Sequence, residues 1–506
     1  MSDLPADSRR TLVGLCLCMG GALVGLASLN YMLLPMLTDL GIDQTGASVA
    51  LSIPSIGSLL VVFLAGRLGS SRGHRTVITW MGMAFVVGSA TVLISQGLPL
   101  IVLGLLLQGL GSTAIQIVVF GLLSERFVEP SARASAFGTF GMVSPFIWML
   151  VPVLTGWMVG EVSWRWVAAL WVVCGLMILL SARVLLPRPR ELEASGEVLT
   201  PILAGAAVAG LVLSLNQLGT DGLTTSTVLV MVGTVAIALF CARLLRRLPK
   251  PTFTLAPLRV GRTRSLLSVV VIIPLINTIF LMTMAFQYLY GLTGLQTALA
   301  MVPAQLAAVL GARLMAGPLM RRIGVTATAT LMFAVLAVAM LGSLLIQTDS
   351  PLWLPIAYVT VFNVLTVSAS ITVTSGVLAS DPDVSANDLS AYRGSGVAVG
   401  QALAVVVMNS IVFGLARLFL NNEFEANGLS QADAASLATQ IQASSTSPDV
   451  MSQYATPLPS GVETSQLMLD SIVTGLHVNG VVGALLALGC VFLVRVGRRA
   501  DLVAVA

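Results

Sequence analysis

The sequence predicts an all-α, polytopic membrane protein. Of its 506 residues, 56% are hydrophobic and 9% are charged, whereas soluble domains carry roughly 25% charged residues. The apolar residues form runs of about 18–26, which suit helices that cross a bilayer and not the shorter alternating strands of a membrane barrel. The mean hydropathy of +0.95 agrees, because a soluble fold of this length could not bury so much apolar surface.

Taken in order, the apolar runs predict fourteen spans. The first run follows Arg9 and Arg10, which suit a cytoplasmic N-terminus better than a secretory signal because many further spans follow. The spans are expected at about residues 12–36, 46–66, 76–95, 98–123, 134–159, 164–186, 199–218, 224–245, 265–289, 296–318, 325–346, 353–379, 391–416 and 471–495.

Two longer polar stretches are not expected to span. Residues 246–264 are basic and contain prolines, and we expect them along the cytoplasmic face. Residues 418–470 are rich in Ser, Gln, Ala and Asp, and we expect them to form an outer loop. Within that loop Ser430 followed by Asp433 predicts the start of a short surface helix. A loop without regular structure is the alternative.

Charge alternates from one connecting loop to the next, and this predicts the topology. Basic loops stay in the cytoplasm, so the sequence predicts a multi-pass protein of the inner (plasma) membrane with both termini cytoplasmic. The residues expected on the cytoplasmic side include Arg67, Arg72, Arg75, Arg126, Arg133, Arg183, Arg321, Arg322, Arg393, Arg495 and Arg498, and the opposite side has Asp39, Asp43, Glu161, Asp221 and Asp349.

A glycine- and arginine-rich segment, residues 66–75, lies between the second and third predicted spans. Its glycines allow a tight reversal of the chain. A partial echo, residues 317–324, lies between two later spans. A segment that recurs at corresponding places predicts two related halves, as in many secondary transporters.

These motifs resemble the major facilitator superfamily, in its fourteen-span drug/proton antiporter branch. Gly66, Leu68, Gly73 and Arg75 are similar to the superfamily's G-x-L-a-D-r-x-G-r-k loop. Further similar segments are Gln108-Gly109-Leu110-Gly111, Pro152-Val153-Leu154-Thr155-Gly156-Trp157 with Ser163-Trp164-Arg165-Trp166, and the stretch from Tyr288 to Pro303.

The resemblance implies two six-helix bundles, an inserted helix pair, a substrate cavity between the bundles, and alternating access. We therefore expect an N-terminal bundle in residues 1–190, the inserted pair and a linker in 191–250, and a C-terminal bundle in 251–506. The chain departs from the family pattern where the loop's acidic residue is replaced by Ser70, and the fourth span's arginine by Leu105.

The span centres hold neutral polar residues, and we find no acid at mid-membrane depth. These neutral groups either join helices or line a cavity for a large apolar substrate. The candidate substrate-binding residues are Asn30, Tyr31, Gln108, Gln116, Asn277, Gln287, Asn363 and Gln401. The candidate gating residues are Gly66, Arg67, Gly73, Arg75, Pro152 and Gly156.

A proton carrier needs a group that titrates near the working pH. Asp39 and Glu161, at the outer ends of spans, are the candidates for coupling, whereas His74 is expected to be a solvated loop residue. The five cysteines fall inside spans as packing residues, so no metal site and no cofactor are predicted. The net charge of +4 gives no reason to expect a nucleic-acid partner.

The sequence therefore predicts a transporter that exports amphiphilic or lipophilic small molecules, with protons as the candidate coupling ion. A lipid transporter or flippase on the same fold, in contact with membrane lipids, is the alternative. A membrane scaffold or sensor that transports nothing is a third reading. We expect no enzyme, because no nucleophile, base and metal come together in the pattern.

Overall fold

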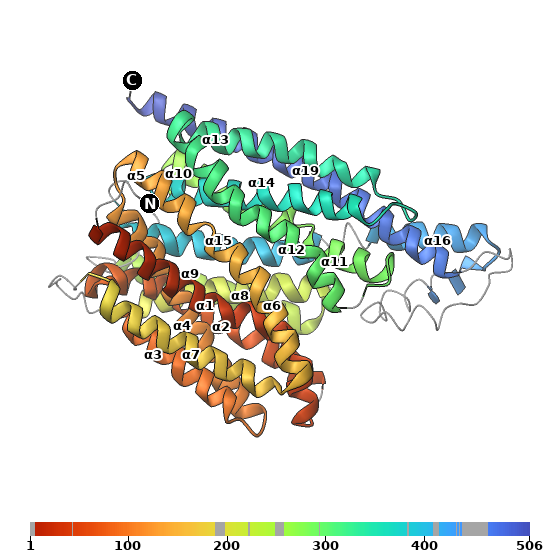
Figure 1. Cartoon of the computed structure of the whole chain (residues 1–506), viewed down its shortest axis with the longest axis horizontal. Helices are drawn as coiled ribbons and strands as arrows, with labels where there is room; N and C mark the ends of the chain where they lie inside the picture. The colour runs from red at the N-terminus through yellow and green to blue at the C-terminus, as the bar shows by residue number, and fades with distance from the viewer. Residues whose placement is uncertain are drawn as a thin grey trace.

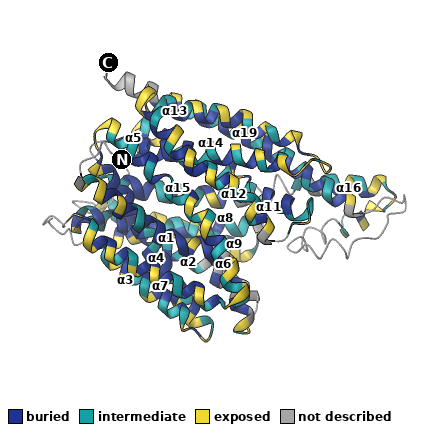
Figure 2. Cartoon of the chain, in the orientation of Figure 1, coloured by how far each residue is buried: buried dark blue, intermediate teal, exposed yellow. Residues whose placement is uncertain are grey.

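The computed structural model describes residues 6–42, 44–187, 198–220, 223–247, 258–292, 294–381, 384–407, 414–431, 433–434, 436–437 and 464–505. Within these ranges the chain is helical and contains no strand (Figure 1). The all-α prediction is confirmed. Buried residues lie on the helix faces that meet one another, and exposed residues lie on the outward faces (Figure 2).

The first half of the chain forms one bundle, most of which occupies the lower part of Figure 1, while its helix α5 lies at the upper left. Its helices α2, α3 and α4 pack closely, and α7 packs on α1 and α3. The bundle consists of α1 (Ala6–Asp39), α2 (Gln44–Arg72), α3 (His74–Leu93), α4 (Leu98–Arg126), α5 (Pro130–Phe140), α6 (Val143–Glu161) and α7 (Trp164–Leu185).

The second half forms another bundle, in the upper part of Figure 1. Its helix α19 packs on α10 and α13, and α14 packs on α12 and α13. The helices are α10 (Gly261–Ile272), α11 (Ile279–Tyr288), α12 (Gly294–Gly311), α13 (Gly317–Met340), α14 (Trp353–Val377), α15 (Ala386–Val407), α16 (Gly414–Ala426) and α19 (Thr464–Val505).

A helix pair lies between the two halves in the sequence, and its first member covers the seam between them. Helix α8 (Leu199–Thr220) packs on both α2 and α15, while α9 (Thr225–Arg247) packs on α8. The close approach of α8 to α2 requires Gly205, because a Cβ there would overlap the carbonyl oxygen of Leu59. Most of α9 stays exposed, as expected for a helix that faces lipid.

Twelve helical stretches of the described chain are long and apolar enough to cross a membrane. One of them, Gln296–Leu345, is 50 residues long and is interrupted at Gly324, where φ is +80°. Helix α15 is not among the twelve. The polytopic prediction is confirmed, whereas the number of fourteen spans stays a prediction.

In both motif segments the chain turns at a glycine with a positive φ, as expected for related segments. Helix α2 continues to Arg72, so residues 66–72 are helical and do not form the expected loop. The reversal occurs at Gly73, with φ +84°, and in the echo at Gly324, with φ +80°. Both values lie in the region that glycine adopts without a steric penalty. The positions predicted for the two turns are therefore right, but the first predicted loop, residues 66–75, is longer than the turn at Gly73.

The polar stretch 418–470 also differs from its prediction. It begins within α16 and ends within α19, and these helices pack on each other. Ser430 Oγ donates to Asp433 Oδ2 (2.6 Å), and Asp433 N donates to Ser430 Oγ (3.3 Å), so the predicted capping contact is present. Residues 438–463 lie outside the described part of the chain.

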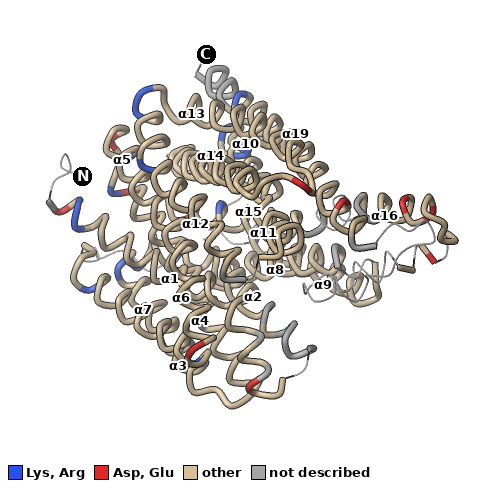
Figure 3. The backbone as a smooth tube through the Cα atoms, turned by 45° about the vertical axis from the view of Figure 1, so that its right-hand side comes forward, with Lys and Arg blue, Asp and Glu red and all other residues tan. Residues whose placement is uncertain are grey.

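Charge is distributed unevenly along the bundles. Most Arg residues of the described chain lie at the end where the chain begins and finishes (Figure 3). We call this the basic end, and we call the other end, with Asp39, Glu161 and Asp349, the acidic end. Arg393, which the sequence assigns to the cytoplasmic side, is the eighth residue of α15.

Candidate functional site

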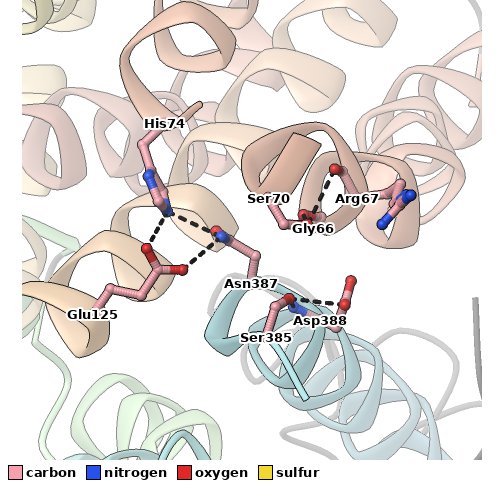
Figure 4. Close-up of polar contacts among 8 residues, drawn as sticks. All are labelled: Gly66, Arg67, Ser70, His74, Glu125, Ser385, Asn387 and Asp388. Atoms are coloured by element: carbon pink, nitrogen blue, oxygen red, sulfur yellow. Dashed lines mark hydrogen bonds and ion pairs between the residues drawn. The ribbon is translucent and has the colours of Figure 1, made fainter. Parts of the chain in front are cut away.

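At the basic end, Asn387 of α15 inserts between α2 and α4 and joins the two bundles (Figure 4). The side chain is fully buried. Its Nδ2 lies 2.9 Å from His74 Nε2 and donates to Glu125 Oε1 at 3.3 Å. Three glycines, Gly66, Gly69 and Gly121, leave room for Asn387, because a Cβ on any of them would crowd it. His74 is therefore part of an interbundle contact and not the solvated residue that we expected.

The echo segment of the second bundle contacts the first bundle in turn. A Cβ on Gly317 would lie 3.3 Å from the Ala134 carbonyl oxygen of α5. Nearby, Arg133 donates from its terminal nitrogen to Ser124 Oγ (2.7 Å) and to the Ser375 carbonyl oxygen of α14 (3.2 Å). Both motif segments thus hold the opposite bundle, and together these contacts close the basic end. We call them the basic-end seal.

The acidic position that this chain lacks on α2 has a counterpart on α15. Ser70 Oγ donates to backbone carbonyls of its own helix, at Gly66 and Arg67, so its hydrogen bonds in the described chain stay within α2. Asp388 instead lies within the electrostatic reach of Arg67 and accepts a hydrogen bond from Ser385 Oγ at 2.8 Å. The carboxylate next to the motif arginine is therefore supplied by the opposite bundle.

At the acidic end, a cavity of about 830 Å³ lies between α6 of the first bundle and α11 and α12 of the second. We call it the mouth cavity. Most of its lining is apolar and aromatic, including Trp148 and Trp157. Five residues singled out from the sequence also line it: Tyr31, Pro152, Gly156, Glu161 and Gln287.

A second cavity, of about 370 Å³, lies where α2, α4, α8 and α15 meet. We call it the seam cavity. It is lined by two predicted residues, Gln116 and Gln401, together with Asn216 and Arg393. The cavity lies on the side of the molecule that the inserted helix α8 covers.

The other candidate substrate-binding residues have structural contacts. Asn363 is buried and donates to the Ala304 carbonyl oxygen and to Gln305 Oε1, both at 3.1 Å, so it joins α14 to α12. Gln108 is 4% exposed and packs against Gly25. Asn277 Oδ1 accepts from Ile279 N at 2.9 Å and begins α11 after a short 3₁₀ turn. The side chain of Asn30 lies outside the described residues.

Gly156 lies in the mouth cavity with open space around its Cα. A Cβ there would meet no atom within 4 Å. We expect Gly156→Ala to leave the melting temperature unchanged, because nothing must move. Gly156→Phe would fill part of the cavity, so transport would fall while folding stays intact. Thermal unfolding in detergent and uptake into liposomes check this pair, and a lower melting temperature for the alanine variant would contradict it.

Asp39 lies at the end of α1, where it holds α7 in place. Its Oδ2 accepts from Trp164 Nε1 (2.9 Å) and from Arg165 (2.8 Å). These hydrogen bonds, that from Trp164 first, lower the pKa of the Asp39 carboxyl below its ordinary value. A carboxylate held in its ionised form is a poor carrier of protons at neutral pH. Glu161, by contrast, is exposed at the mouth cavity.

The lowered pKa of Asp39 predicts a pH dependence of stability. The fold favours the ionised form, so the contribution is present at neutral pH and is lost as the pH falls below about 4. We expect Asp39→Asn to lower the melting temperature slightly at pH 7, with the difference shrinking as the pH falls below about 4. Glu161→Gln, which changes a carboxylate without such contacts in the described chain, is the control. An equal difference at pH 7 and below about pH 4 would refute the assignment.

Sequence reasoning missed Asn387 and Arg393 as functional candidates. Asn387 precedes the predicted span 391–416, and Arg393, the third residue of that span, has a topological explanation as a basic residue on the cytoplasmic side. The signal that could have found Asn387 is the helix start at Ser385-Ala386-Asn387-Asp388, where Ser385 Oγ accepts from Asp388 N at 3.1 Å. Beginning the helix there brings Asn387 into the bundle interface.

Comparisons with known proteins agree with this geometry. The Major Facilitator Superfamily profile matches residues 15–408. The MFS-type transporter YhcA of Bacillus subtilis is 23% identical over 290 residues, which cover 56% of this chain and 54% of that protein. The drug efflux pump JefA of Mycobacterium tuberculosis is 26% identical over 270 residues, which cover 51% of this chain and 52% of that protein. The chain thus spans about half the length of these curated relatives.

Solved structures share the fold at low sequence identity. The human organic anion transporter TETRAN superposes with a TM-score of 0.58 at 14% identity, and the match covers 97% of this chain and 100% of that one. The Escherichia coli fucose:proton symporter FucP gives 0.56 at 12% identity, covering 96% and 97%. With a profile match over most of its length and this fold, the chain belongs to the major facilitator superfamily.

Proposed function

We propose that this protein is a secondary transporter that exports amphiphilic or lipophilic small molecules by alternating access. The observation that carries the proposal is the asymmetry of the bundle interface. The basic end is closed by Asn387, Arg133 and the two motif segments, while the acidic end holds the mouth cavity. Alternating access requires such a state, in which one side is closed and the other is hollow.

The lining of the mouth cavity supports an amphiphilic substrate. Trp148, Trp157 and Met301 provide apolar surface, and Tyr31 and Gln287 add neutral polar groups. A pocket of this kind suits a large apolar molecule with a few polar groups. The resemblance to a drug efflux pump supports export as the direction.

The charge distribution supports an orientation in the inner membrane with both termini in the cytoplasm. The basic end would then face the cytoplasm, because positively charged loops stay on that side. In this orientation the seal is cytoplasmic and the mouth cavity opens outward. Glu161 is our candidate for proton coupling, since its carboxylate lies in that cavity.

A reversible cross-link across the seal tests alternating access. A Cβ on Gly141 would lie 3.3 Å from the Ala312 Cβ of the opposite bundle, which is close to the separation in a disulfide. We expect the Gly141→Cys/Ala312→Cys protein to transport a lipophilic dye across liposome membranes when it is reduced and to stop when it is oxidised. In each single-cysteine variant, oxidation should leave dye transport unchanged.

The same liposomes, with an imposed pH gradient or with labelled lipid added, decide between the proposed functions. Dye movement that continues through the oxidised protein would overturn alternating access at this seal. Movement that ignores an imposed pH gradient would overturn proton coupling. If labelled lipid crosses the leaflets and soluble dyes do not, the lipid flippase becomes the better reading.

A further inference from the structure

Arg393 lies at an unusual place for a cation. It is the eighth residue of α15, about 10 Å along the helix from Ala386 at the usual rise. There it lines the seam cavity, between the two bundles and beneath α8. Charged side chains inside membrane spans are costly, and those that persist usually serve a function.

The contacts of Arg393 leave its charge without a counter-ion. Its Nε donates to Thr374 Oγ1 at 2.7 Å, and the guanidinium carbon lies 4.5 Å from the centroid of the Phe120 ring. The ion pairs of the described chain are elsewhere, at His74–Glu125 and Arg165–Asp39. The described residues offer no carboxylate to Arg393 and no acceptor to its two terminal amino groups.

The rest of the cavity lining suits the remainder of an anionic molecule. Gln116, Gln401 and Ser58 supply neutral hydrogen-bonding groups, while Leu26 and Val397 supply apolar surface. None of the residues that line the cavity is acidic. The volume of about 370 Å³ is at the lower end of the range of small-molecule sites, roughly 300–1,000 Å³.

We propose that the seam cavity binds the anionic group of an amphiphile, with Arg393 as its anchor. A carboxylate, sulfonate or phosphate would accept hydrogen bonds from the two terminal amino groups of Arg393. A guanidinium can bind such a group through two parallel hydrogen bonds. The apolar part of the molecule would lie against Leu26 and Val397. This inference rests on the proposed transport function, and it specifies the charge of the transported molecules.

Arg133 offers a matched control. It too is an interbundle arginine that stacks on a phenylalanine, with its guanidinium carbon 5.3 Å from the Phe137 ring centroid. Its Nη2, however, donates to Ser124 Oγ and to the Ser375 carbonyl oxygen, its Nε donates to Ser375 Oγ at 3.3 Å, and it lines neither cavity. Loss of Arg133 would loosen the seal without removing a charge from the seam cavity.

The test uses three probes with one apolar body: dansyl-undecanoate, its methyl ester and its choline ester. The purified protein is placed in phosphatidylcholine nanodiscs, and the dissociation constants are measured by dansyl fluorescence. We expect the acid to bind at least about tenfold more tightly than the methyl ester. Arg393→Gln should remove this preference, Arg393→Lys should retain part of it, and Arg133→Gln should leave it intact.

A second variant keeps the arginine in place, in case Arg393→Gln does not fold. Gln401→Glu puts a carboxylate into the same cavity, so it should also remove the preference for the acid. A repeat in nanodiscs that contain phosphatidylglycerol separates the two sources of anion. Weaker binding of the acid there would identify an anionic lipid as the occupant, and unchanged binding would identify a free organic anion.

The outcomes separate this inference from transport itself. If the wild type binds all three probes equally, or if Arg393→Gln and Gln401→Glu both keep the preference for the acid, the anion site is refuted even if the dyes cross liposomes. If no probe crosses but the acid binds in an Arg393-dependent way, the transport proposal fails and the anion site stands.

Discussion

In the Gly121→Ala variant we expect the basic end of the protein to open. A Cβ at position 121 would overlap Asn387 Oδ1 and lie 3.2 Å from Asn387 Cα, so α15 must move away from α4. Overpacking of this kind costs roughly 1–3 kcal/mol. Only the closed conformation carries that cost, so the equilibrium shifts toward a state in which the basic end is open.

The seal is built so that a small change can open it. Asn387 Oδ1 is buried and has no hydrogen-bond partner in the described chain, and such a group costs about 1–3 kcal/mol. The hydrogen bonds of Asn387 Nδ2 to His74 and Glu125 offset this cost in the closed state. Because these two contributions nearly balance, a small added cost in the closed state should favour the open one.

Labelling of a buried cysteine measures the opening. Ala391 is 1% exposed beneath Gly66, so a maleimide should react slowly with an Ala391→Cys protein. We expect the addition of Gly121→Ala to speed the reaction by about tenfold or more. Gly489→Ala is the control, because a Cβ at Gly489 meets nothing within 4 Å.

A double variant tests whether the effect passes through Asn387. Removal of this side chain in Asn387→Ala should itself speed the labelling of Ala391→Cys. Since the overlap then disappears, Gly121→Ala should add little on the Asn387→Ala background, and the two effects should be strongly non-additive. Independent, additive effects would mean that Asn387 is not the contact that holds the gate.

The architecture could be predicted from the sequence because it depends on patterns that survive without tertiary information. Runs of apolar residues set the helices, and the motif segments at Gly73 and Gly324 set two equivalent reversals, which the structure gives φ values of +84° and +80°. The clustering of arginines at one end follows from the same pattern. Each of these signals is local, so no knowledge of the neighbouring helices is needed.

The site could be predicted only in part, because the direction in which a polar residue faces depends on how its helix is rotated. Gln116 and Gln401 line a cavity, whereas Gln108 packs on Gly25 and Asn363 joins two helices. All four are amides in apolar helices and look alike in the sequence. Arg393 was missed for another reason: a basic residue near the start of the predicted span 391–416 has a topological explanation, and only the packing of α15 on α2, α4 and α8 makes it a cavity residue.

In the Gly205→Val variant we expect the inserted helix pair to separate from the first bundle. Helix α8 approaches α2 so closely at Gly205 that a side chain would collide with the backbone carbonyls of Leu59 and Leu60. Backbone atoms cannot move aside as a flexible side chain can, so the cost should reach or exceed the roughly 1–3 kcal/mol of ordinary overpacking. The seam cavity would lose the wall that Val212 and Asn216 of α8 provide.

Gly233→Val is the control for this variant. It makes the same substitution in α9, where a Cβ meets nothing within 4 Å, so helix propensity and hydrophobicity change in the same way. We expect Gly205→Val to lower the melting temperature in detergent and to weaken binding of dansyl-undecanoate, while Gly233→Val leaves both unchanged. If the two variants had the same melting temperature and the same affinity for dansyl-undecanoate, the contact between α8 and α2 would not be needed for stability. The seam cavity would then bind the probe without the wall that α8 provides.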